Sequence, residues 1–301
     1  MLFMRSFKKI TEQVVKRNLI AFCAKKLSSQ NGKDQQNVMG RGLPKKKPIP
    51  GVKDIILVAS GKGGVGKSTI SVNIALGMTQ NGVKVGLLDA DIFGPSIPKL
   101  MQINQKPEVN KDGLMIPPFN HGMPCMSMGF LIPENAPVVW RGMMVMQAVQ
   151  QLLWKVYWEN IDVLIVDMPP GTGDVPLSII QNVPISGAVI VSTPQDIALT
   201  DVRRGVEMFK KMSVPVLGLV QNMSVYLCSN CGQKTHIFGK DKLEKLTKIM
   251  DLEILGDVPL HENISEFSDK GTPFVIESPE SLEALSIRAI AQKVCEKLSN
   301  R

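Results

Sequence analysis

Short apolar runs alternate with stretches of helical spacing along most of the chain. The first run, Ile55–Ser60, ends at a glycine-rich loop, and residues 67–80 beyond it carry apolar side chains spaced for a helix. Further buried strands are expected at Val83–Leu88, Val163–Val166, Ala188–Val191, Val216–Val220 and Ile254–Val258. Strands separated by helical stretches predict an α/β fold, with a mainly parallel sheet and helices on both of its faces.

Two regions interrupt this alternation. Residues 92–141 are rich in Pro and Met and offer only short strand candidates, and residues 223–238 form an insertion that carries two cysteines. Between these regions, an apolar stripe from Met143 to Val156 has the spacing of a helix that packs on the core. Near the C-terminus, Ser281–Leu298 mixes apolar positions with charges of both signs, which favours packing on the body over membrane binding.

The amino-terminal segment differs in charge from the rest of the chain. The net charge is +8 over 301 residues, but residues 1–53 hold 13 of the 35 Lys and Arg and two of the 27 acids. The remaining residues carry 22 bases and 25 acids, a net charge of −3, so a nucleic-acid surface is not indicated. No apolar run approaches the roughly 18 residues needed to span a bilayer, so no transmembrane segment is expected.

The first residues have the composition of a targeting segment. Residues 1–30 are basic and acid-poor, with apolar residues between the bases, which predicts a mitochondrial transit segment. A solvated basic tail or a membrane-surface helix is the alternative. Residues 31–51 are polar and contain several Gly and Pro, so they predict a linker before a folded domain at 52–301.

The glycine-rich loop has the pattern Gly-x-x-x-x-Gly-Lys-Ser, from Gly61 to Ser68. Glycines at this spacing let successive backbone N–H groups turn toward phosphate oxygens. Lys67 would neutralise the β- and γ-phosphates, and Ser68 would ligate magnesium. Because the loop lies between a predicted strand and a predicted helix, a P-loop nucleotide site is expected, formed by Gly61, Lys62, Gly63, Gly64, Val65, Gly66, Lys67, Ser68 and Thr69.

Three aspartates follow predicted strands. Asp167 directly follows the run Val163–Val166, while Asp89 and Asp91 follow Val83–Leu88. Ligands of open α/β sheets bind at the carboxyl ends of the strands, so all three carboxylates can converge on the phosphate site. Oxygen ligands suit magnesium, and a carboxylate can orient the attacking water.

Three segments together resemble the MinD-like P-loop ATPases. They are residues 61–69, Asp89–Ser96 and Asp167–Asp174, which look like a deviant Walker A motif, switch I and switch II. The similarity runs from about Arg41 to the C-terminus, and is most specific for the Mrp branch. Within that branch it is closest to mitochondrial members that support iron–sulfur cluster delivery to respiratory complex I.

The resemblance implies a role for each matching residue. Lys62 matches a signature lysine that reaches the nucleotide of a dimer partner, as an arginine finger would. Asp91 matches a switch residue that positions water, Asp89 a residue near magnesium, and Asn222 a contact to the base. Lys62, Lys67, Asp91 and Asp167 would carry slow ATP hydrolysis. The choice of ATP rests on the resemblance, and the resemblance and the N-terminal segment together predict a location in the mitochondrial matrix.

Cys228 and Cys231 form the C-x-x-C pair of the chain. Two residues between cysteines let both sulfurs reach one metal centre, so the sequence itself predicts a two-thiolate metal site. The resemblance selects an iron–sulfur cluster. Because a cubane cluster usually takes four thiolates, it implies a homodimer bridged by one [4Fe–4S] cluster. A zinc knuckle shared by two chains and a redox dithiol are the alternatives.

Two functions are therefore compatible with the sequence. The first is an ATP-dependent carrier that delivers a [4Fe–4S] cluster to apoproteins, in particular subunits of complex I by resemblance. The second is a positioning ATPase of the MinD or ParA type. The cysteine pair favours the carrier, because positioning needs no thiolate whereas a cluster carrier must have them.

Overall fold

The computed structural model describes residues 46–131, 142–228, 231–239 and 242–301 of the chain. Within these residues, nine strands form one sheet: β1 (Val52–Ser60), β2 (Val85–Asp89), β5 (Phe119–Asn120), β6 (Met123–Ser127), β7 (Ile161–Asp167), β8 (Gly187–Ser192), β9 (Val216–Leu227), β10 (Lys234–Thr235) and β11 (Ile254–Leu260). Their order is β10-β9-β8-β1-β7-β2-β6-β5, with β11 paired to β9. All pairs are parallel except those made by β10 and β5, which confirms the mainly parallel sheet.

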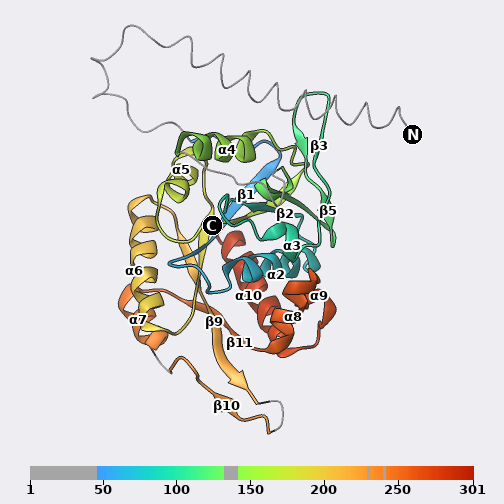
Figure 1. The fold of residues 1–301 in the computed structure, drawn as a ribbon. Coiled ribbons are helices and arrows are strands. Elements are labelled where there is room, and N and C mark those ends of the chain that lie inside the picture. Colours follow the sequence, from blue (N-terminus) through green and yellow to red (C-terminus); the bar gives the residue numbers. More distant parts are fainter. Residues whose placement is uncertain (1–45, 132–141, 229–230, 240–241) are drawn as a thin grey trace. The chain divides into compact units, whose positions relative to one another are not determined.

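Helices cover both faces of this sheet (Figure 1). In that view α2, α8, α9 and α10 lie on one side, and α5, α6 and α7 lie along the other. The helices are α2 (Lys67–Gln80), α3 (Ile97–Leu100), α4 (Gly142–Trp154), α5 (Asp174–Asn182), α6 (Asp196–Lys211), α7 (Lys242–Met250), α8 (Glu262–Lys270), α9 (Phe274–Glu277) and α10 (Leu282–Ser299). Among the helices of the described residues, none combines the length and apolar character that a bilayer span requires.

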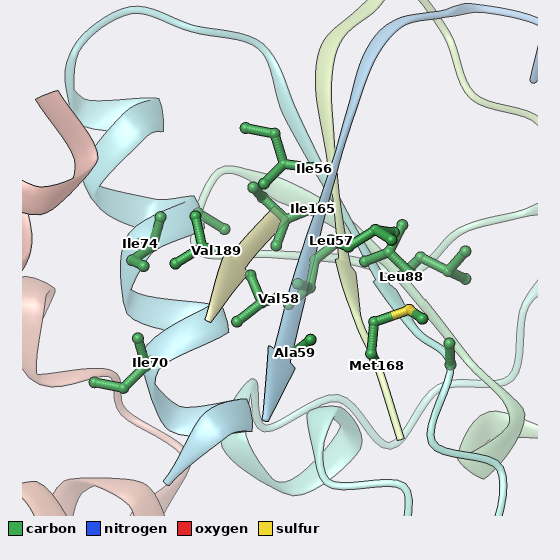
Figure 2. Close-up of a cluster of buried hydrophobic side chains, with 14 of the residues drawn as sticks. Ile56, Leu57, Val58, Ala59, Ile70, Ile74, Leu88, Ile165, Met168 and Val189 are labelled. Carbon is green, nitrogen blue, oxygen red and sulfur yellow. The ribbon is translucent and has the colours of Figure 1, made fainter. Parts of the chain in front are cut away.

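The central strand β1 shows why the strands of this sheet are continuous apolar runs in the sequence. Ile56, Leu57 and Val58 are completely buried. Figure 2 shows Ile56 and Val58 on the side of α2 and Leu57 on the opposite side, because successive side chains of a strand alternate. Since both faces are covered by helices, both sets of side chains must be apolar.

The helix α2 is fastened to the body by a close contact with α10. A Cβ atom on Gly77 of α2 would lie 3.1 Å from the Cβ of Ala291 on α10. The apolar face of α10, which includes Ile287, Ile290 and Val294, is fully buried. The expectation that the last amphipathic helix packs on the body is therefore confirmed.

Some predicted boundaries differ from the structure. The strand expected at Val216–Val220 continues as β9 to Leu227, because it pairs with β8 on one edge and with β11 on the other. The predicted insertion at 223–238 is thus the end of β9, a turn and the returning strand β10. The apolar stripe of α4 is buried at Val149 and Leu153, but Met143 is 75% exposed.

The end of the predicted linker packs on the folded body. Ile49 is only 2% exposed, and the backbone N–H of Lys47 donates to the carbonyl of Asn182. The linker was predicted from the Gly and Pro residues of 31–51, and the apolar side chain of Ile49 was not taken into account. The predicted transit segment, residues 1–30, lies outside the described residues.

Candidate functional site

The glycine-rich loop connects the carboxyl end of β1 to the first turn of α2. Gly64 and Gly66 both have φ near +80°, a left-handed conformation that favours glycine. A Cβ on Gly63 or Gly64 would meet no atom within 4 Å, whereas one on Gly66 would lie 2.3 Å from the Asn222 amide nitrogen. The loop is therefore open on one side and packed tightly on the other.

A pocket of about 430 Å³ lies on the open side of this loop. From the loop and α2 it is lined by Ser60, Lys62, Gly63, Gly64, Gly66, Lys67, Ser68 and Thr69, and from further along the chain by Asp91, Pro95, Ser96, Lys99, Leu100, Pro170, Ser268 and Asp269. Backbone groups of an open glycine loop beside a lysine fit a nucleotide phosphate chain.

Lys67 and Asp167 form a buried ion pair at the floor of this site. The Lys67 Nζ lies 2.6 Å from Asp167 Oδ1, and the two side chains are 7% and 0% exposed. Ser68 and Ser71 each donate a hydroxyl hydrogen bond of 2.6 Å to the same carboxylate. The structure thus brings together the three predicted residues Lys67, Ser68 and Asp167, and adds Ser71. Asp167 keeps Lys67 and Ser68 aligned at the start of α2.

Asp89 is turned into the protein and lies outside the pocket lining. It is 1% exposed, and its carboxylate accepts hydrogen bonds from the Ile97 N–H and the Ser127 hydroxyl. Burial, and then the neighbouring Asp167 carboxylate, raise the pKa of Asp89 to about 7. In this geometry Asp89 holds the start of α3, so its expected role near magnesium stays a prediction.

Asp91, two residues after Asp89 in the segment that follows β2, lines the pocket. Its Oδ1 accepts a 3.3 Å hydrogen bond from the Gly94 N–H, and burial raises its pKa. Of the three expected carboxylates, Asp89 and Asp167 are therefore buried, and only Asp91 lines the pocket. In the part of the chain that the structure describes, no group of three or more His, Cys, Asp or Glu side chains converges on a metal position.

The other expected loop residues have two kinds of environment. Lys62 lines the pocket, and its Nζ donates to the Gln195 Oε1 at 3.3 Å. Val65 is buried, and its carbonyl accepts a 2.8 Å hydrogen bond from the Asn222 amide. Asn222 thus supports the loop from behind, and the base contact implied by the resemblance stays a prediction. Gly61 packs against Asp201 of α6 instead of lining the pocket.

Sequence reasoning missed the far wall of the pocket. Lys99 at the end of α3 and Asp269 of α8 form an ion pair of 2.6 Å, with both side chains largely exposed. These residues are 170 positions apart, so no local pattern could connect them. Only the packing of α3 on α8 places them at the same rim.

The C-x-x-C pair lies at the tip of a β-hairpin. β10 pairs antiparallel with the end of β9, and the hairpin projects beyond the sheet in Figure 1. The Cys228 N–H donates to the Gln233 carbonyl, and the Gly232 N–H donates to the Cys228 carbonyl. Gly232 has φ +67°, as the tight turn expected there requires. Cys231 is exposed and Cys228 partly buried.

Two further described cysteines have different surroundings. Cys125 of β6 is completely buried, and burial raises the pKa of its thiol well above the usual range. Cys295 is partly buried on α10 against the core. The hairpin pair is therefore the better donor set for a soft metal.

A phosphate-type loop at the carboxyl end of the central parallel strand, with a buried Lys67–Asp167 pair beneath it, defines a P-loop nucleotide-binding protein of the α/β class. Residues 51–295 match the family described as ParA: NUBPL iron-transfer P-loop NTPase. The chain belongs to this family.

Two relatives cover most of the chain. A mouse protein named "Iron-sulfur cluster transfer protein NUBPL" is 59% identical over 265 residues, which are 87% of this chain and 83% of the mouse protein. An Arabidopsis thaliana protein named "Iron-sulfur protein required for NADH dehydrogenase, mitochondrial" is 52% identical, over 83% of this chain and 80% of the plant protein.

Solved structures agree with the fold. A nucleotide-binding protein from Archaeoglobus fulgidus, in complex with ADP, has a TM-score of 0.68 and 35% identity over 78% of this chain and 91% of its own. The cell division ATPase MinD of Pyrococcus furiosus has a TM-score of 0.60 at 20% identity, over 81% of this chain and 98% of its own. The second likeness confirms the MinD-like fold alone.

Proposed function

We propose that this protein is an ATP-dependent carrier that binds a [4Fe–4S] cluster and delivers it to apoproteins. The observation that carries the proposal is the projecting hairpin, which presents Cys228 and Cys231 on a chain of the iron-transfer family. A pair of thiolates on a projecting hairpin, with Cys231 exposed, can both receive a cluster and give it up, because an acceptor protein can approach the hairpin directly.

The open loop fits the phosphates of ATP. Its backbone N–H groups would face the phosphate chain, and Lys67 would exchange its contact with Asp167 for the β- and γ-phosphates. The Ser68 hydroxyl would then hold Mg²⁺, whose charge offsets that of the phosphates. Support comes from the volume of the pocket and from the ADP bound by the archaeal relative.

Slow hydrolysis of ATP would use the residues around this pocket. Asp91 faces the pocket and would position the attacking water. Lys62 would reach the nucleotide of a second copy, where its positive charge stabilises the transition state. Asp167 would keep the metal and Ser68 in place from below.

The cluster is cargo, and its ligand count requires two chains. One hairpin offers two thiolates, and a cubane cluster usually takes four. A two-fold dimer would bring two hairpins together, so that Cys228 and Cys231 from each chain complete the site. A dimer would also place Lys62 of one chain near the nucleotide of the other.

Relatives and the N-terminal segment support a proposal for the recipients and the compartment. The Arabidopsis relative is named as mitochondrial and as required for NADH dehydrogenase. We therefore place this protein in the mitochondrial matrix, with subunits of complex I as recipients. A reporter fused to residues 1–40 should enter mitochondria, and cytosolic fluorescence would contradict the transit segment at 1–30.

The alternative, a positioning ATPase, has the same fold, but its function does not require the cysteine thiolates of the hairpin. The MinD likeness at 20% identity supports the fold only, whereas the family match extends over 51–295. A positioning role would predict ATP-dependent binding to a surface with no metal on the protein.

The experiment is anaerobic purification and reconstitution, followed by absorption and Mössbauer spectra and native mass spectrometry. We expect a [4Fe–4S] spectrum, half a cluster per chain, and a dimer that carries the metal. Cys295→Ala is the matched control and should bind iron normally, because Cys295 lies on α10 and not on the hairpin. Stoichiometric zinc without iron would favour the zinc knuckle, and a complete cluster on a monomer would contradict the bridged dimer.

A further inference from the structure

Gln195 lies at the turn between β8 and α6, next to the glycine-rich loop. It is the N-cap residue of α6, yet its side chain makes no capping hydrogen bond to that helix. Instead its Oε1 accepts a hydrogen bond from the Lys62 Nζ at 3.3 Å. The contact joins two segments that are 133 positions apart, so the fold brings them together.

The backbone on both sides of this contact is fixed. A Cβ atom on Gly61 would lie 2.4 Å from the Cβ of Asp201, so the start of the loop packs directly on α6. The Ser60 hydroxyl donates to the Lys62 carbonyl at 3.0 Å, and the Gly171 N–H donates to the Ser60 carbonyl. Lys62 and Gln195 therefore face each other from two elements that cannot separate easily.

The two loop lysines have partners of different charge. Lys67 pairs with the Asp167 carboxylate, which compensates its positive charge. Lys62 pairs with a neutral amide, so its charge stays available while its side chain is held in one direction. A free lysine loses rotamer entropy when it is ordered, and a partner that already holds it lowers the cost of ordering it later.

We infer that Gln195 is a positioning residue for Lys62: it aims the lysine ammonium for ATP hydrolysis without neutralising it. This inference rests on the proposed role of Lys62 in hydrolysis. Gln195 itself touches neither nucleotide nor metal in this assignment. It acts only through the lysine.

Two substitutions separate orientation from charge. Gln195→Ala removes the acceptor without removing a helix cap, because the Gln195 side chain does not cap α6. The kcat should fall by about three- to tenfold, which corresponds to the loss of one hydrogen bond. The KM for ATP should not change. Gln195→Glu keeps an acceptor but pairs the lysine charge. Its kcat should also fall, and the loss should shrink as salt screens the ion pair. A salt-independent loss in Gln195→Glu would overturn the neutral-partner argument.

A double-mutant cycle tests whether the effect passes through Lys62. In the Lys62→Ala background, Gln195→Ala should cause no further loss of turnover. An undiminished loss in that background would overturn the positioning role while leaving the role of Lys62 intact. If Lys62→Ala itself leaves turnover unchanged, the proposed role of Lys62 fails. Thr200→Ala is the matched control and should leave turnover unchanged, because the Thr200 hydroxyl on α6 is exposed and donates to the Asp196 carbonyl of its own helix at 3.2 Å.

A second measurement does not depend on turnover. Reductive methylation with ¹³C labels the lysines of the full-length protein, and the Lys62 resonance is assigned by its disappearance in Lys62→Arg. In the nucleotide-free protein this resonance should shift and sharpen in Gln195→Ala, because the ammonium loses its acceptor. An unchanged Lys62 resonance in Gln195→Ala would overturn the contact, whatever the ATPase activity.

Discussion

The glycine-rich loop and the cysteine hairpin occupy opposite kinds of position in one sheet. The loop follows the central strand β1, and Lys67 at its end is almost fully buried together with Asp167 of β7. The hairpin extends from β9, is paired through only two residues of β10, and exposes Cys231. Under the proposed function, one chain would form the phosphate cradle but supply only two of the four cluster thiolates. A single copy would then bind a nucleotide, whereas the cluster would need a second copy.

The largest expected effect is on the hairpin side. Cys228→Ala should abolish iron incorporation and the dimer that depends on it, because each chain then offers one thiolate. ATP affinity should not change, since the hairpin is not part of the pocket lining. Iron content, native mass spectrometry and calorimetry check the three parts. Full iron incorporation after anaerobic reconstitution would sink the two-thiolate proposal.

Lys62→Ala should lower ATP turnover by on the order of 10³-fold, because a positive charge supplied in trans to the phosphoryl group raises kcat by about that factor. ATP binding should persist, because Lys67 and the loop backbone remain. Turnover and binding are measured on the same reconstituted dimer. Retained turnover would mean that the lysine has no part in hydrolysis.

Lys67→Ala should weaken ATP binding by on the order of 100-fold, the loss of charge-assisted contacts to phosphate. It also leaves the Asp167 carboxylate buried without its cation, which should lower the free energy of unfolding by about 3 kcal/mol. Adding Asp167→Asn should restore much of that stability but not the affinity. Calorimetry and denaturant unfolding separate the two effects, and wild-type affinity in Lys67→Ala would refute the phosphate site.

The last expected effect concerns Asp89 and is confined to a window of pH. Its folded pKa, about 7, lies above the ordinary 3.8, so the folded state binds more protons between these values. Wild-type stability from this group is therefore present at low pH and lost as pH rises from about 4 to about 7, by at most about 1.4 kcal/mol per pH unit. Asp89→Asn does not titrate, so its stability relative to wild type should rise over this window.

Unfolding is measured in EDTA without nucleotide, to keep metal binding out of the comparison. The matched control is Asp112→Asn, which changes a carboxylate on an exposed turn. If the difference in the free energy of unfolding between Asp89→Asn and wild type stays constant from pH 4 to pH 8, the raised pKa is contradicted.

The sequence predicted the interior of the sheet better than its edges. β1, β7 and β8 are buried on both faces, so they are continuous apolar runs that pattern alone can find. β9 was cut short because Gln221 and Asn222 interrupt its apolar run. Its length comes from hydrogen bonds to β8, β11 and β10, which are contacts across the chain and leave no local pattern.

In the candidate site, too, the sequence predicted the residues of local motifs but not those that only packing brings together. Lys67 and Ser68 are fixed by a short motif, and Asp167 by its place after a strand, so the sequence was enough to bring them together. Lys99, Asp269 and Gln195 come from separate elements, and only packing places them at the loop. Asp89 shows the limit of the strand-end rule, because its side chain turns inward to the Ile97 N–H instead of toward the pocket.

The contact between Gly77 and Ala291 has a consequence in evolutionary terms. An alanine at position 77 would bring two Cβ atoms within 3.1 Å, so the helix that follows the phosphate loop can gain volume there only if α10 gives way. The two positions, far apart in the chain, are thus not free to change independently. Across diverging relatives their side-chain volumes should vary in opposite directions, and a large residue at one should accompany glycine at the other.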